Sequence, residues 1–145
     1  MPSIDNTLLE SALKIAIKAH EGQTDKAGKA YILHPLRIAS NCSTIETQIV
    51  ALLHDVVEDS SITLEDLKTS GFPDTIIDAI DSVTRRRNES YMDFVCRCSK
   101  NPIGKAVKLL DLDDNMNIKR LSKISEADIK RLNKYKVAYD YLKCL

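Results

Sequence analysis

Residues 46–67 read ETQIVALLHDVVEDSSITLEDL, and this stretch carries the most information about the fold. Its apolar residues recur at helical spacing, so one side of a helix is predicted to face a core. Its members in this stretch are Ile49, Leu52, Leu53 and Val56, and Ile45 just before the stretch continues the pattern. The pair His54-Asp55 lies inside this apolar run. A histidine and a carboxylate beside so many core residues are costly to bury unless they are paired or bind a metal ion.

Helical patterns also flank this stretch on both sides. Thr44 starts the central helix, and Thr63 is expected to cap the next one, with Asp66 three residues on. Only four glycines and four prolines occur, and β-branched or aromatic residues never alternate over a long stretch. We therefore predict an all-α protein, a compact helical bundle. The other helices are expected over about 6–20, 35–42, 74–83, 91–99, 103–120 and 125–141.

Length and composition indicate one globular domain over residues 1–145. The chain is 43% hydrophobic and 29% charged, which is ordinary for a folded domain of this size. Because 21 basic residues balance 21 acidic ones, disorder is excluded, and so is the basic surface typical of proteins that bind nucleic acids or membranes. The longest apolar run, Ile49 to Leu53, is far too short to span a bilayer.

The N-terminal sequence and the cysteines predict a cytoplasmic protein. The first ten residues, MPSIDNTLLE, contain neither the basic nor the apolar region of an export signal. The four cysteines form no C-x-x-C pair, so we expect free thiols in a reducing compartment.

Four residues that lie far apart in the sequence form a candidate metal site. They are His34, His54, Asp55 and Asp111, and the last three lie in predicted apolar helices. Two imidazoles and two carboxylates are a plausible ligand set for one divalent ion. The dipeptide His54-Asp55 alone is weak evidence, because a polar pair between helices would explain it equally well.

Helical geometry adds other groups to this candidate site. On one continuous helix, His54, Asp55, Glu58 and Asp59 would project within an arc of roughly 140°. Lys108, Asp111 and Asn115 would fall within about 60° of each other on another helix. A metal ion, a base, a phosphate-binding cation and an orienting amide are what metal-assisted hydrolysis of a phosphoester requires.

Three stretches in order resemble the HD-domain hydrolases of the RelA/SpoT homologue family, most of all its stand-alone small alarmone hydrolases. They are AHEGQTDKAGKAYILHPLRIA (19–39), residues 46–67, and NPIGKAVKLLDLDDNM (101–116). The resemblance implies a single-domain helical bundle with guanosine-3′,5′-bis(diphosphate) 3′-diphosphatase activity. Such an enzyme removes the 3′-pyrophosphate of guanosine tetra- or pentaphosphate to give GDP or GTP. Its partner would be a small nucleotide, and a homo-oligomer is possible.

The resemblance also implies roles for individual residues. One divalent ion, typically manganese, would be held by His34, His54, Asp55 and Asp111, although such ligands also accept other transition metals. Glu58 and Asp59 would handle the attacking water. Lys26, Asn115 and, less specifically, Tyr31 match positions that contact the nucleotide. Lys108 joins them because it shares a helix face with Asp111.

The sequence departs from the long bifunctional enzymes of this family at several positions. Asp25 and Ala27 stand where those enzymes often carry Arg and Ser, which indicates the stand-alone subgroup. Asp113 and Asp114 replace Leu-His, and this extra negative charge near a polyphosphate is unexpected. The substrate range therefore stays open. Another nucleotide polyphosphate, a 3′-phosphorylated dinucleotide cofactor or a non-catalytic nucleotide sensor are the alternatives. With no room for a synthetase domain, we do not expect alarmone synthesis.

Four further features each have two interpretations. His20 is either a structural histidine or a support for His34. The run 85–87, three arginines, is either a solvated turn or supplies one arginine to the substrate's phosphates. Arg37 either pairs with a carboxylate of the site or lies on the surface. The apolar stripe of the last helix is either core or a subunit contact; it comprises Tyr135, Tyr139 and Leu142.

Overall fold

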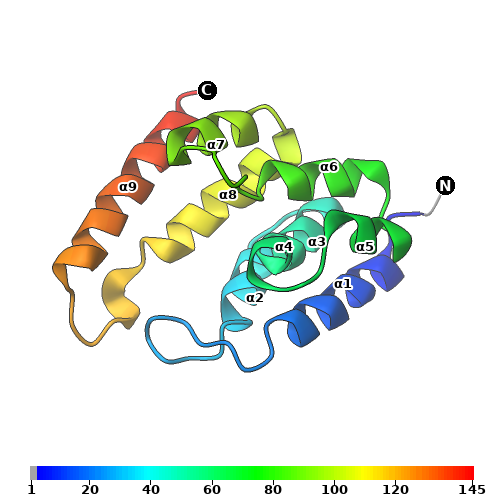
Figure 1. Ribbon diagram of the computed structural model, residues 1–145, viewed down its shortest axis with the longest axis horizontal. Helices are drawn as coiled ribbons and strands as arrows, with labels where there is room; N and C mark the ends of the chain where they lie inside the picture. Colours follow the sequence, from blue (N-terminus) through cyan, green and yellow to red (C-terminus); the bar gives the residue numbers. More distant parts are fainter. Residues whose placement is uncertain (1–2) are drawn as a thin grey trace.

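The computed structural model describes residues 3–145, which fold into a compact bundle of helices (Figure 1). In chain order the helices are α1 (Asn6–Ala19), α2 (Leu33–Ser40), α3 (Ile45–Leu53), α4 (Val56–Asp59), α5 (Leu64–Thr69), α6 (Asp74–Ser82), α7 (Tyr91–Ser99), α8 (Pro102–Asn115), the 3-10 helix η1 (Ile118–Arg120) and α9 (Glu126–Lys143). Among these residues the only β-structure is one isolated bridge between Thr24 and Ala30. The predicted all-α fold is confirmed.

Two predicted helix starts are confirmed by their capping hydrogen bonds. Thr44 accepts a hydrogen bond from the Thr47 N–H, and Thr63 accepts one from the Asp66 N–H. In both cases the third helical residue bonds back to the cap, so two otherwise unpaired N–H groups are satisfied at each start.

The predicted continuous helix through residues 54–59 is wrong. α3 ends at Leu53 and α4 begins at Val56, so His54 and Asp55 lie in the turn between them. The cause is local, because the His54 ring donates from Nδ1 to the Ala51 carbonyl at 2.6 Å. A side chain that binds a nearby carbonyl competes with the helical backbone bond to that oxygen.

Two other predicted boundaries also differ. α2 begins at Leu33, so His34 lies in its first turn rather than before it. α8 ends at Asn115, and the predicted extension to residue 120 instead forms η1. Asn117 initiates that short helix, because its side chain accepts a hydrogen bond from the Lys119 N–H.

Two hydrophobic clusters hold the bundle together, and α8 contributes to both. The larger cluster surrounds α3, which packs against α1, α2, α6 and α8. The smaller cluster joins α7, α8 and α9 through Val95, Leu112, Ala138 and Leu142. In Figure 1, α8 runs through the middle of the bundle, with α9 on one side and α3 on the other. None of the helices in residues 3–145 has the length and apolar character needed to cross a bilayer.

Gly104 sets the distance at which α6 and α8 cross. A Cβ atom built there would overlap the Ser82 hydroxyl and lie 3.2 Å from the Ser82 Cβ. Both residues are buried, and the Ser82 hydroxyl is engaged because it donates to the Ala79 carbonyl at 2.6 Å. The missing side chain therefore lets the two helices approach closely.

Candidate functional site

Three side chains that could hold a metal ion come from distant parts of the chain and meet in the interior. His34, His54 and Asp111 each offer one ligand atom, and these atoms all lie within 4.8 Å of one another. The three residues are only 2–4% exposed. Asp55 lies beside them, with its Oδ2 3.0 Å from His54 Nε2 and 3.9 Å from His34 Nε2. The structure thus brings together the four residues that the sequence singled out.

His54 presents an unpaired nitrogen to this cluster. Its Nδ1 lies 2.6 Å from the Ala51 carbonyl, which can only accept, so Nδ1 carries the proton. Nε2 then holds a lone pair, and it is buried without a hydrogen-bond donor. Nε2 lies 3.0 Å from Asp55 Oδ2 and 3.3 Å from Asp111 Oδ1, so these two carboxylates favour positive charge at this nitrogen, either a proton or a metal ion. The donor set therefore fits a divalent metal ion.

The ring of His34, like that of His54, is oriented by an acceptor at Nδ1, so its Nε2 faces the cluster. Its Nδ1 lies 2.6 Å from Asp114 Oδ2, and its Nε2 lies 2.9 Å from Asp111 Oδ1. Burial would lower the pKa of His34, but the hydrogen bonds to the two aspartates outweigh it and raise that pKa. The surroundings of Nε2 thus favour positive charge.

Asp111 is held by the residues that were predicted to share its helix face. Lys108 Nζ donates to Oδ2 at 2.9 Å, and Asn115 Nδ2 donates to Oδ1 at 3.1 Å. Burial would raise the pKa of Asp111, but Lys108 and His34 hold it well below its ordinary value. The carboxylate is therefore ionised and fixed in orientation.

Tyr31 anchors Asp55. Its hydroxyl donates to Asp55 Oδ2. Burial, followed by the charge of Asp55, raises the pKa of Tyr31 far above its ordinary value, so the hydroxyl remains a donor. The ring packs 4.9 Å from His20, whose Nδ1 lies 2.8 Å from Gln23 Oε1. His20 therefore supports Tyr31. The Tyr31 ring in turn packs 5.6 Å from His34, so His20 reaches His34 through Tyr31.

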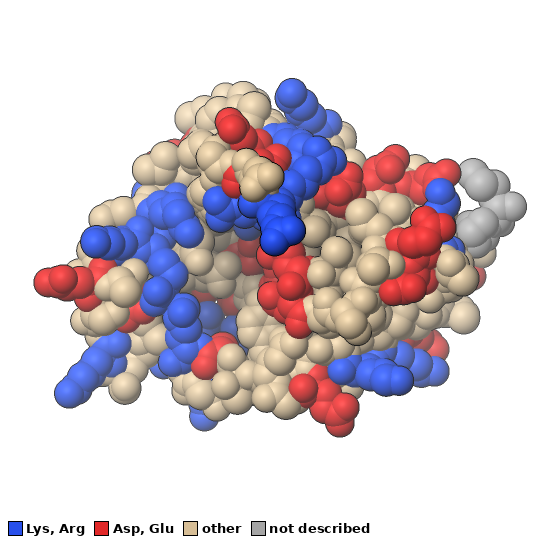
Figure 2. Space-filling model, viewed as in Figure 1, with Lys and Arg blue, Asp and Glu red and all other residues tan. Residues whose placement is uncertain are grey.

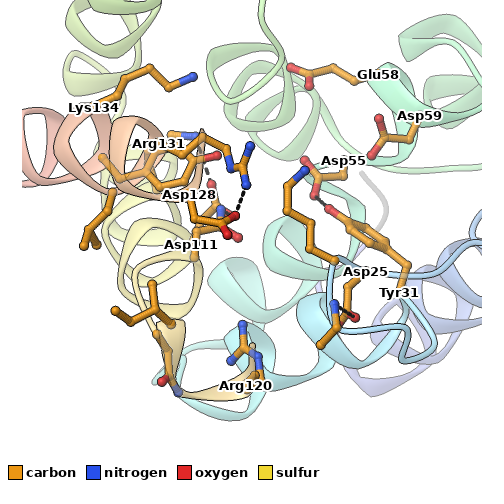
Figure 3. A pocket seen from close by; sticks show the side chains of 18 of the residues that line it. Asp25, Tyr31, Asp55, Glu58, Asp59, Asp111, Arg120, Asp128, Arg131 and Lys134 are labelled. Carbon is orange, nitrogen blue, oxygen red and sulfur yellow. Dashed lines mark hydrogen bonds and ion pairs between the residues drawn. The ribbon is translucent and has the colours of Figure 1, made fainter. Parts of the chain in front are cut away.

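A cavity of about 470 Å³ opens above Asp55 and Asp111. This is within the range of sites that bind small molecules. Figure 3 shows Asp55, Glu58 and Asp59 on one side of it and Arg131 and Lys134 on the other. The predicted residues that line it are Lys26, Tyr31, Asp55, Glu58, Asp59, Lys108, Asp111 and Asn115.

Glu58 and Asp59 form the acidic wall of the cavity. Glu58 Oε1 accepts a hydrogen bond of 2.5 Å from the Arg85 backbone N–H, which fixes its position. Burial at the wall raises the pKa of Glu58 more than this hydrogen bond lowers it. Burial, and then the charge of Asp55, also raises the pKa of Asp59. Carboxylates with raised pKa values are better bases than ordinary ones.

The opposite wall is basic, and sequence reasoning missed its residues on α9, Arg131 and Lys134. Arg85, Lys108, Arg131 and Lys134 line the cavity. Figure 2 shows basic atoms over α9 and acidic atoms over α4, on either side of a hollow. Among the ion pairs of residues 3–145, none includes Arg85 or Lys134. Burial, and then nearby cations such as Arg85, lowers the pKa of Lys134, which indicates positive charge in excess.

The arginines of the 85–87 run and Arg37 have different surroundings. Arg85 lines the cavity, whereas Arg86 pairs with Asp81 at 3.2 Å, and Arg87 is exposed. Arg37 pairs with Asp114 at 2.8 Å rather than with one of the four candidate ligands. The stripe on α9 is core at Leu142, while Tyr135 also lines the cavity.

Several bacterial proteins are similar in sequence to this chain. A GTP pyrophosphokinase of Streptomyces coelicolor is 32% identical over 138 residues, covering 84% of this chain and 16% of that protein. Guanosine-3′,5′-bis(diphosphate) 3′-pyrophosphohydrolases of Vibrio cholerae and Aquifex aeolicus are 36% and 30% identical over 89 and 139 residues. These matches cover 59% and 87% of this chain. The chain corresponds to only 12% and 19% of those two proteins' length.

The fold and the family are shown by two further comparisons. A solved structure, described as a metazoan orthologue of SpoT that hydrolyses ppGpp and plays a role in starvation responses, matches with a TM-score of 0.77 at 21% identity. The match covers 98% of this chain and 87% of that one, and it shows that the two share a fold. Residues 12–108, which include His34, the His54-Asp55 turn and Lys108, match the family model of the HD domain. A chain matched over this length, with a buried His-Asp cluster beneath a cavity, belongs to the HD domain family.

Proposed function

We propose that this protein hydrolyses the 3′-pyrophosphate of guanosine tetra- or pentaphosphate, releasing pyrophosphate and GDP or GTP. The observation that carries the proposal is one cavity with a buried His-His-Asp cluster at its base, carboxylates on one wall and cations on the other. A bound divalent ion would act as a Lewis acid that makes water more acidic and takes up negative charge from phosphoryl oxygens. Manganese is the ion that we propose.

The acidic wall is suited to proton transfer. Glu58 is fixed by the Arg85 N–H, and its free oxygen can accept a proton from a water molecule in the cavity. Asp59 follows it in the chain and also lines the cavity, so it can relay that proton or orient the same water. The ligands in this proposal are His34, His54, Asp55 and Asp111.

The basic wall is suited to polyphosphate binding. A guanosine tetraphosphate carries several negative charges, and Arg85 and Lys134, which form no ion pair among residues 3–145, can neutralise them. Lys108 adds a cation at the junction between this wall and the cluster, since it already contacts Asp111. Lys26 and Asn115, at the remaining edges of the cavity, would contact the nucleoside. Tyr31 would contribute through Asp55.

We further propose that residues 1–145 work as one domain, because α8 takes part in both hydrophobic clusters. The cytoplasmic location and the possible homo-oligomer stay predictions. The cysteines among residues 3–145 are free, as a reducing compartment would require.

The test is to incubate the purified protein with guanosine tetraphosphate and manganese, then with EDTA, and to identify the products. We expect GDP and pyrophosphate with manganese and no turnover with EDTA. Release of inorganic phosphate instead, or turnover only of another nucleotide in a panel, would change the substrate but keep the enzyme class. Binding of the nucleotide without any product under any divalent ion would make the protein a sensor.

A further inference from the structure

Asp114 is the most heavily hydrogen-bonded carboxylate next to the cluster. Its Oδ2 accepts from His34 Nδ1 at 2.6 Å and from Arg37 NH2 at 3.0 Å. Its Oδ1 accepts from Arg37 Nε at 2.8 Å and from Arg120 NH1 at 3.2 Å. These four donors use the lone pairs that the two oxygens offer.

The negative charge of Asp114 is therefore compensated and does not face the cavity. Two guanidinium groups surround a side chain that is only 13% exposed. The sequence left open how this charge would act on a polyphosphate; the structure pairs the carboxylate with His34 and the arginines, and Asp114 is not among the residues that line the cavity. Its neighbour Asp113 is exposed, and its side chain takes part in no hydrogen bond or ion pair among residues 3–145.

The contact with His34 determines which ring nitrogen faces the cluster. A carboxylate only accepts hydrogen bonds, so Asp114 holds a proton on Nδ1 of the His34 ring. Nε2 is then left to face Asp111 and His54. A histidine that binds a metal is usually oriented in this way by an acceptor on its other nitrogen.

The same aspartate also holds one edge of the cavity. Arg120 NH2 donates to the Asp114 carbonyl at 3.0 Å, in addition to the bond from NH1 to the carboxylate. Arg120 belongs to η1, and the segment 117–121 contributes four residues to the cavity lining: Asn117, Ile118, Arg120 and Leu121. Asp114 is thus bonded both to a candidate ligand and to a wall of the substrate cavity.

We propose that Asp114 is a positioning residue that fixes the ring of His34 for metal binding and, through Arg120, fixes the 117–121 segment at the cavity edge. The inference rests on the proposed metal-dependent function and identifies a residue that serves it. The two roles can be tested separately. The orientation of His34 requires only the Asp114 carboxylate, whereas the position of the 117–121 segment also requires Arg120.

The first experiment measures manganese affinity from the free-ion signal in electron paramagnetic resonance, with the full chain and the metal alone. Asp114→Asn keeps the volume of the side chain but removes its charge. We expect it to weaken manganese binding about 10- to 100-fold, the usual effect of losing such an orienting group. Asp113→Asn, the same change one residue earlier, should bind manganese like the wild type. Arg120→Gln should also bind manganese normally but raise KM.

The second experiment uses the fact that the chain contains only three histidines. With ¹⁵N-histidine, each Nδ1–H group gives its own signal in the metal-free protein. We expect Asp114→Asn to shift or remove the Nδ1–H signal of His34 while those of His20 and His54 stay in place. A thermal melt of each variant verifies that it is folded.

The outcomes distinguish this inference from the proposed function. If Asp114→Asn binds manganese as tightly as the wild type and the His34 signal is unchanged, the positioning role is overturned while the function stands. If Arg120→Gln loses as much manganese affinity as Asp114→Asn, the effect runs through the segment, and direct orientation of His34 is overturned. A wild-type protein that binds no divalent ion would overturn both proposals. Wild-type binding without turnover would overturn only the function.

Discussion

Each histidine of the chain is oriented by one particular acceptor. His54 bonds to the Ala51 carbonyl, His34 to Asp114, and His20 to the Gln23 side chain. The Gln23 amide is itself fixed, since its nitrogen donates to the Ala19 and Asp59 carbonyls. In all three rings Nδ1 is therefore the donor. Nε2 of His20 and of His54 has no hydrogen-bond partner, whereas Nε2 of His34 contacts Asp111.

At this scale the first prediction concerns the turn between α3 and α4. Replacing His54 or Asp55 by Ala should abolish both metal binding and turnover, because each removes a group that faces the cluster. Metal content measured by elemental analysis, next to pyrophosphate release, checks this. A variant that loses turnover while it retains a full complement of metal would contradict the ligand assignment.

Glu58→Gln gives the second prediction. The amide keeps the shape and can still accept the hydrogen bond from the Arg85 N–H, but it cannot take a proton. We expect kcat to fall about 10²- to 10⁴-fold, the range for loss of a general base, with metal affinity unchanged. Glu65→Gln, an exposed glutamate on α5, is the matched control. Equal rates for both variants would remove Glu58 from the mechanism.

The ligand-type residues could be predicted because charge among apolar helical residues is unusual and needs an explanation. The part of the basic wall that α9 contributes could not be predicted. Arg131 and Lys134 look like ordinary surface residues of α9, and only the packing of α9 against α8 brings them over Asp111. Their spacing of three, next to Tyr135, was the one available signal that they share a helix face.

Helix starts could be predicted from the sequence where a side chain caps them, as Thr44 and Thr63 do. The break between α3 and α4 was not predictable, because it depends on a histidine ring turning back to its own helix. The consequence for the site is direct. In a continuous helix two successive side chains diverge by about 100°, but in this turn His54 and Asp55 meet at 3.0 Å.

The connection between α6 and α7 depends on one ion pair. Arg97 on α7 binds both oxygens of Glu89, at 2.8 and 3.0 Å, and also donates to the Asp81 and Thr84 carbonyls. The hydrogen bonds from Arg97 lower the pKa of Glu89 to about 2. This pair holds the loop whose Arg85 N–H positions Glu58.

The third prediction follows from that pKa. Because the pKa of Glu89 is lower in the folded than in the unfolded chain, its contribution to stability is complete above about 4.5 and is lost as the pH falls towards 2. Glu89→Gln should therefore destabilise by roughly 1 kcal/mol near neutral pH, the upper end for a partly exposed pair. Urea denaturation should show this difference shrinking near pH 3. A difference that is constant with pH would contradict it.

The crossing of α6 and α8 gives the fourth prediction. Gly104→Ala should destabilise by about 1–3 kcal/mol because the new methyl group meets Ser82, although alanine is the better helix former. The penalty should be smaller in a Ser82→Ala background, where the hydroxyl is absent. Chemical denaturation of the four proteins of this double-mutant cycle measures the coupling, and equal penalties in both backgrounds would exclude it.

For the whole molecule, the fifth prediction is stabilisation by metal. The candidate ligands come from α2, the α3–α4 turn and α8, so one ion would join three segments that are distant in the sequence. A ligand at 100 times its dissociation constant stabilises by about 2.7 kcal/mol. For a chain of this size that raises Tm by roughly 5–10 °C. Melting curves with manganese, with EDTA and for His54→Ala measure it; a manganese shift that persists in His54→Ala would place the ion elsewhere.

The division into two hydrophobic clusters has a consequence for how the protein comes apart. His34 and His54, beneath the cavity, are packed against the larger hydrophobic cluster. Arg131 and Lys134 belong to α9, which packs on the smaller hydrophobic cluster. Helices that pack on a small hydrophobic cluster open locally, with a smaller free energy than global unfolding requires, and their amide hydrogens exchange through these openings. Amides of α9 should thus exchange faster than those of α3. A molecule in which α9 alone has opened would still bind its metal ion but would no longer bind anions at Arg131 and Lys134.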